Sequence, residues 1–126
     1  MNHIVFIVLL RRFLFLLISL AAGPALAAEP FEGRWAEEAA WCARPDRASD
    51  ETAIRLGMRE LVFFASTCTV TRIVALPPVF RIAAQCRDEG ENLAVRVAMQ
   101  FVLNVTGDRL SLTEKSWGTQ TYVRCP

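Results

Sequence analysis

Four cysteines are the residues of this chain whose possible chemistry is easiest to define: Cys42, Cys68, Cys86 and Cys125. Thiols form disulfides, hold metal ions as grouped thiolates, or act as nucleophiles when a base activates them. The C-x-x-C spacing of tetrathiolate metal sites is missing, and residues 28–126 contain no histidine that could activate a thiol. The sequence therefore predicts two disulfides, for which four cysteines allow three pairings.

Histidine is the second informative residue type, because the only one, His3, stands close to the start of the chain. Without it, Ser-His-Asp and Cys-His nucleophiles and histidine metal sites are excluded, and there is no glycine-rich phosphate loop. Glu37 and Glu38 could suggest a carboxylate pair, but adjacent side chains usually point apart, so we interpret them as solvated surface. We expect no catalytic residue, no metal ligand and no cofactor, and hence a protein that is not an enzyme.

Residues 1–27 are predicted to be a secretory signal peptide. Two arginines precede an apolar core at 13–20, and a small-x-small site ends at Ala27. We expect cleavage there or after Ala28; the alternative is an uncleaved anchor, because 4–10 is also apolar. The mature chain is then periplasmic or secreted, in a compartment where disulfides form.

Residues 28–126 are expected to form one disulfide-stapled β domain. They hold all 13 acidic residues and all but two of the 14 basic ones, which gives a formal net charge of −1. A chain with this net charge lacks the excess of positive charge that attracts nucleic acid or anionic lipid. We therefore expect neither a nucleic-acid partner nor a membrane contact after the signal is cleaved.

The second half of the chain shows apolar residues at alternate positions, which is typical of half-buried strands. Seven large apolar residues alternate without a break from Leu93 to Val105, a pattern that no helix keeps. With the turn residues between them, the alternating segments predict strands at 67–74, 80–87, 92–105, 109–114 and 119–125. The fold class is therefore all-β: an antiparallel up-and-down meander that forms a small barrel or a strongly curved sheet.

The first half is less regular. A strand at 31–36, a short helical turn at 37–41 and a loop at 44–50 are expected. The segment 52–60 is compatible with helix or strand, whereas the β-branched and aromatic residues at 62–64 favour strand there.

The hairpin register selects a disulfide pairing. A five-residue loop at 75–79 sets Cys68 directly opposite Cys86 on one face, within the separation that a disulfide tolerates. This leaves Cys42 to pair with Cys125, which ties the N-terminal segment to the last strand.

The expected turns also predict which other residues lie opposite each other on neighbouring strands. The 75–79 loop also sets Val70 opposite Ala84, Arg72 opposite Ile82 and Val74 opposite Phe80. Two-residue turns at 89–90 and 107–108 set Cys86 opposite Leu93, Ala84 opposite Val95, Leu103 opposite Leu112 and Val105 opposite Leu110. Apolar residues then share one face of the sheet, and Arg72 is the one charged residue that this register places on that face.

The Gly33-x-Trp35 start, the early Trp41-Cys42 and the late Cys125 resemble small lipocalin-like secreted barrels, notably bacterial periplasmic proteins of unassigned function. More distantly, the same architecture carries periplasmic inhibitors of metalloproteases or lysozymes. Four cysteines depart from the one-disulfide protease inhibitors, and no inhibitory residue can be transferred to this chain.

The expected function is a non-catalytic module that binds a protein partner in the cell envelope, with an inhibitor of an envelope hydrolase as its specific form. Trp117, on a predicted hairpin tip, is the main candidate contact, and Trp35 and Phe31 are further ones. The alternative is a carrier of a small apolar ligand inside the barrel. Large inward residues favour a filled interior and thus the module: Phe80, Ile82, Val97, Met99, Phe101 and Leu103.

The first prediction concerns chemistry. The mature protein should hydrolyse no common ester, glycoside or peptide substrate and should contain no stoichiometric zinc or iron, because it lacks histidine and a convergent acid–base pair. Chromogenic substrate assays and metal analysis check this. Turnover that survives repurification and scales with protein concentration would show that the protein is an enzyme.

Overall fold

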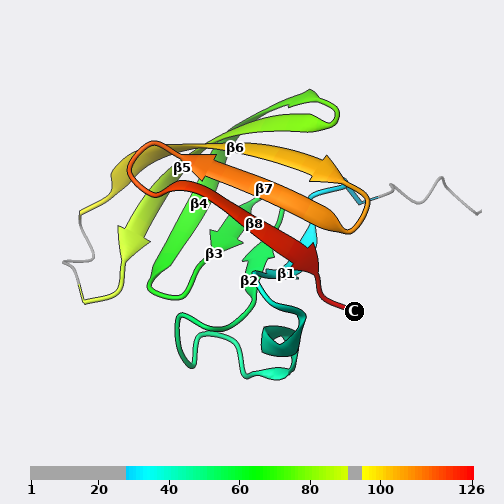
Figure 1. Ribbon diagram of the computed structural model, residues 1–126. Helices are drawn as coiled ribbons and strands as arrows, with labels where there is room; N and C mark the ends of the chain where they lie inside the picture. Colours follow the sequence, from blue (N-terminus) through cyan, green and yellow to red (C-terminus); the bar gives the residue numbers. More distant parts are fainter. Residues whose placement is uncertain (1–27, 91–94) are drawn as a thin grey trace, which may run out of the picture.

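The computed structural model describes residues 28–90 and 95–126, which form a closed barrel of eight antiparallel strands (Figure 1). The predicted signal peptide, 1–27, and the start of the strand expected over 92–105 lie outside the described residues.

Each strand pairs with the next one along the chain, and the last pairs with the first. The strands are β1 (Gly33–Ala36), β2 (Ile54–Leu56), β3 (Glu60–Val62), β4 (Ser66–Leu76), β5 (Val79–Asp88), β6 (Val97–Thr106), β7 (Arg109–Glu114) and β8 (Gly118–Arg124). A short 3-10 helix, η1 (Ala39–Ala43), follows β1. The predicted all-β up-and-down meander is confirmed, the sheet closes, and the ambiguous segment 52–60 contains strand.

Both predicted disulfides are present: Cys68–Cys86 joins β4 to β5, and Cys42–Cys125 joins η1 to the end of β8. In the β4–β5 ladder Cys68 lies directly opposite Cys86, as the register predicted. Pairing of Val70 with Ala84 is confirmed as well.

Beyond Val70 the predicted register is wrong, because β4 contains a β-bulge between Val70 and Arg72 and the turn consists of Pro77 and Pro78 instead of the expected loop at 75–79. A bulge inserts one unpaired residue and exchanges the faces of the side chains that follow it. Ile73 is therefore the residue opposite Ile82, and Arg72 is exposed instead of inward-facing. The bulge removes the one charged residue that the regular pattern had placed in the core.

The β5–β6 register also differs, by four residues. Ala84 lies opposite Met99 instead of Val95, and Cys86 lies opposite Val97. A shift by an even number leaves every side chain on its predicted face. It moves Val97 to the strand end, where it is 56% exposed, so its predicted core position is wrong. The β6–β7 register is as predicted, with Leu103 opposite Leu112 and Val105 opposite Leu110.

The interior of the barrel is filled with side chains. The largest fully buried residues are Trp35, Phe31, Phe80, Phe101, Leu61, Ile82, Leu103, Leu110 and Leu112. Met99 packs against this core while remaining partly exposed. Burial of aromatic and aliphatic area on this scale is the main source of stability for a small domain.

One end of the barrel, which we call the closed end, is sealed by Phe31, Trp35 and Arg124. The indole Nε1 of Trp35 donates to the carbonyl of Phe31 over 2.8 Å, and the Phe31 ring meets Phe80 edge-on with 5.1 Å between centroids. The Arg124 guanidinium lies over the Trp35 ring, 4.2 Å from its centroid. It also donates to the carbonyls of Glu32 and Pro30, at 3.0 and 2.5 Å.

The seam between β1 and β8 is as short as the β2–β3 ladder, with two residue pairs: Trp35 lies opposite Arg124 and Ala36 opposite Val123. The backbone N–H of Cys125 extends it by donating to the Arg34 carbonyl over 2.9 Å. The Cys42–Cys125 disulfide spans 83 positions in the chain and ties η1 beside this seam. On the chain-entropy model, such a long crosslink stabilises by about 4 kcal/mol.

The second prediction concerns the closed end. Arg124→Ala should lower the free energy of unfolding by about 2 kcal/mol, because it removes a cation–π contact and charged hydrogen bonds to two carbonyls. Urea unfolding of the oxidised protein measures this. Arg109→Ala, an exposed arginine at the start of β7, is the matched control and should change stability by less than about 0.5 kcal/mol. Equal effects of the two variants would show that Arg124 does not hold the seam.

Candidate binding cleft

The opposite end of the barrel, the open end, carries the connections from β1 to β2, β3 to β4 and β7 to β8. A cleft of about 720 Å³ lies there. Its lining residues are Glu37, Trp41, Asp50, Glu51, Thr52, Ile54, Phe63, Phe64, Ala65, Ser66, Asp88, Glu89, Trp117, Gln120 and Tyr122. Its volume lies in the range of small-molecule and side-chain pockets.

Three aromatic rings separate the cleft from the packed interior. Phe63 stacks on Phe101 with centroids 5.5 Å apart, and Trp117 meets Phe63 edge-on at 5.0 Å and Phe101 at 5.6 Å. Phe101 is fully buried, whereas Trp117 keeps 38% of its surface exposed. The indole of Trp117 thus covers the barrel end with one side and faces solvent with the other.

Glu114 holds the turn that carries Trp117. Its carboxylate oxygen Oε2 accepts hydrogen bonds from the backbone N–H of Ser116 at 2.8 Å, the Ser116 hydroxyl at 2.6 Å and the backbone N–H of Trp117 at 3.0 Å. These bonds, that of the Ser116 hydroxyl first, lower the pKa of Glu114 although burial opposes the shift. The ionised carboxylate therefore fixes the position of the indole.

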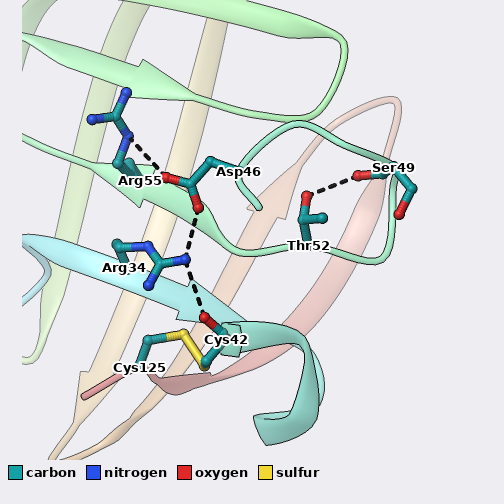
Figure 2. A network of polar contacts seen from close by, with 7 residues as sticks. All are labelled: Arg34, Cys42, Asp46, Ser49, Thr52, Arg55 and Cys125. Carbon is teal, nitrogen blue, oxygen red and sulfur yellow. Dashed lines mark hydrogen bonds and ion pairs between the residues drawn. A yellow bond between two sulfur atoms is a disulfide. The ribbon is translucent and has the colours of Figure 1, made fainter. Parts of the chain in front are cut away.

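The loop between η1 and β2 forms one wall of the cleft, and a polar network holds it against the barrel (Figure 2). Asp46 accepts a hydrogen bond from Arg34 at 2.7 Å and lies 3.8 Å from Nε of Arg55. Arg34 also donates to the carbonyl of Cys42, at 3.3 Å. A half-exposed ion pair adds little stability by itself, so its main effect here is to position the loop.

Further contacts tie the same loop to its surroundings. Arg47 forms an ion pair with Glu89 and lies 3.5 Å from the hydroxyl of Thr67. Arg44 forms an ion pair with Glu51 at 2.6 Å. The charged side chains of this loop are thus partly engaged in fixing its position.

Tyr122 lies in the cleft as a neutral hydrogen-bonding group. Its hydroxyl donates to Oε1 of Gln120 over 2.6 Å. Burial, reinforced by the negative charge of Glu37, raises the pKa of Tyr122 well above its ordinary value of 10. The hydroxyl therefore stays protonated at neutral pH.

The predicted contact residues separate into two groups. Trp117 lies at the cleft, but Phe31 and Trp35 are fully buried at the closed end. A fully buried side chain offers no surface to a partner, so only Trp117 is retained as a contact. Tyr122 and the aromatic pair at 63–64 also line the cleft and were not among the predicted contact residues. The position of that pair directly before a turn was the available signal in the sequence.

No three His, Cys, Asp or Glu side chains within 28–90 and 95–126 converge where they could hold a metal ion. Within the same residues, no helix is long and apolar enough to cross a bilayer. The two disulfides are compatible with an extracytoplasmic location.

Comparisons of the chain with models of known protein families, with curated proteins and with solved structures found no match. An eight-stranded antiparallel barrel with two disulfides is consistent with a small lipocalin-like protein. Fold alone does not define the function of such a barrel.

The third prediction concerns pH. Because the folded-state pKa of Glu114 is lowered, its stabilising effect is present above its ordinary value of 4.5 and is lost as pH falls through the lowered value. The stability difference between the wild type and Glu114→Gln should therefore be largest at neutral pH and shrink in acid. Urea unfolding at several pH values, with Trp117 fluorescence as a second signal, measures this. A difference that is independent of pH would contradict the assignment of the ionised form.

Proposed function

We propose that the protein is a non-catalytic binding module of the cell envelope and that it engages a protein partner through its open end. The observation that supports this is the contrast between a filled, sealed interior and a cleft with a half-exposed tryptophan at its edge. Exposed aromatic residues beside a concavity are typical anchors of protein interfaces.

Two features of the sequence support the non-catalytic and envelope parts of the proposal. Residues 28–126 contain no histidine, and the first 27 residues have the pattern of a signal peptide. The resemblance to periplasmic inhibitor barrels suggests a specific form of the function, in which the partner is an envelope hydrolase that the module inhibits.

Carriage of a small apolar ligand is the second candidate function, and the cleft volume of about 720 Å³ favours it. Phe63, Phe101 and Trp117 close the route into the barrel, so such a ligand would lie at the open end instead of inside. Copurified lipid or another apolar ligand, identified by mass spectrometry of the exported protein, would favour the carrier over the module.

The fourth prediction tests the protein-binding function. Trp117→Ala should weaken the complex with the envelope partner by about 2 kcal/mol, roughly thirtyfold in dissociation constant, if the indole is an interface anchor. Capture from envelope extract, followed by titration of the captured protein, measures this at a temperature where unfolding curves show the variant folded.

Leu76→Ala is the matched control, because Leu76 is a 66% exposed apolar side chain at the β4–β5 turn, at the barrel end away from the cleft. It should leave the affinity unchanged. Equal losses in both variants, or none in either, would contradict docking through the open end.

A further inference from the structure

We propose that the cleft binds a cationic side chain, an arginine in preference to a lysine, that the protein partner presents; this inference rests on the proposed function. The cleft combines negative charge at its rim, aromatic faces along its wall and floor, and a buried hydroxyl. Each feature suits a guanidinium group on an apolar stem.

The charge of the cleft is negative. Five of its lining residues are carboxylates, and no lysine or arginine is among them. Glu51 and Glu89 form ion pairs with arginines of the neighbouring loop. Among the described residues no ion pair involves Glu37, Asp50 or Asp88, so three negative charges lack a cationic partner. An incoming cation gains more in a concave site of one sign than on an open surface.

The aromatic side chains of the cleft are the second feature that suits a cation. Trp41, Trp117, Phe63, Phe64 and Tyr122 line the same cleft as these carboxylates. Aromatic faces attract cations, and a planar guanidinium both stacks on them and donates to carboxylates in a fixed fork. Among the described residues the same pairing occurs at the closed end, where Arg124 lies over Trp35, and at the cleft itself, where Arg44 lies 5.8 Å from the Trp41 ring centroid.

Ser66 supplies an independent observation. It lines the cleft and is only 5% exposed, and within the described residues the hydrogen-bond partner of its hydroxyl is the Cys68 sulfur at 4.0 Å. A disulfide sulfur at that distance is a weak partner. A hydroxyl oxygen can accept two hydrogen bonds, so a guanidinium N–H that enters the cleft would find an acceptor in Ser66.

The experiment uses two probes that differ in charge and hardly in shape: the Nα-acetyl methylamides of arginine and of citrulline. Nitrogen-15 spectra of the mature, oxidised protein report the indole N–H signals of its tryptophans. Trp41 and Trp117 line the cleft, whereas the indole of Trp35 is buried and bonded to the Phe31 carbonyl. Trp35 is therefore an internal control for the fold.

The arginine probe should shift the Trp41 and Trp117 signals, leave Trp35 in place, and bind roughly tenfold more tightly than the citrulline probe. Glu37→Gln/Asp88→Asn should abolish most of this preference. The control Glu38→Gln/Glu60→Gln makes the same change in net charge with residues that do not line the cleft, and should retain the preference within about twofold.

Equal binding of the two probes, no binding of either, or equal losses in the two double variants would overturn the inference. So would full capture of the envelope partner by Glu37→Gln/Asp88→Asn while Trp117→Ala fails to capture it; that result leaves the proposed function standing. Conversely, the arginine probe could bind in a way that depends on the carboxylates while Trp117→Ala captures the partner as well as the wild type does. That result supports the site for a cationic side chain and overturns the proposed docking through Trp117.

Discussion

The packing of Arg124 on Trp35 is the contact on which the rest of the structure depends. The barrel closes through the short β1–β8 seam, where these two residues lie opposite each other. A guanidinium over the indole, hydrogen bonded to carbonyls before β1, holds both strands and covers the end of the core. Hydrogen bonds to a charged donor are stronger than neutral ones, which compensates for the small number of backbone pairs in the seam.

The two ends of the barrel differ, because only one of them is sealed by packed side chains. At the closed end, Arg124 packs on the ring of Trp35, and the indole N–H of Trp35 donates to the carbonyl of Phe31. At the open end, aromatic rings form the floor of the cleft. The nearby arginines form ion pairs that hold the loop between η1 and β2, and three carboxylates of the cleft lack a cationic partner among the described residues. Side chains fill the interior of this small barrel, so the proposed binding is assigned to the end that is not sealed.

The sequence was most informative where a periodic pattern has only one solution. A turn signal between two alternating segments placed Cys68 opposite Cys86, and their pairing left Cys42 for Cys125. Alternation is blind to shifts by two or four residues, so the β5–β6 register was wrong although every side chain kept its face. The only sign of the bulge after Val70 in the sequence is Arg72, a charged residue at a position where the regular register expects an apolar one. The cleft could not be predicted, because Glu37, Ser66 and Tyr122 come together through barrel closure and not through any local pattern.

The most direct test of the sealed barrel is hydrogen exchange at the Trp35 indole N–H, which is buried and donates to the Phe31 carbonyl. If the closed end is sealed as described, this proton should exchange only through global unfolding, with the same opening free energy as the slowest amides of β5 and β6. Exchange at a clearly lower free energy would show that the end opens locally. The interior would then be accessible, which would contradict a filled barrel that binds only at its open end.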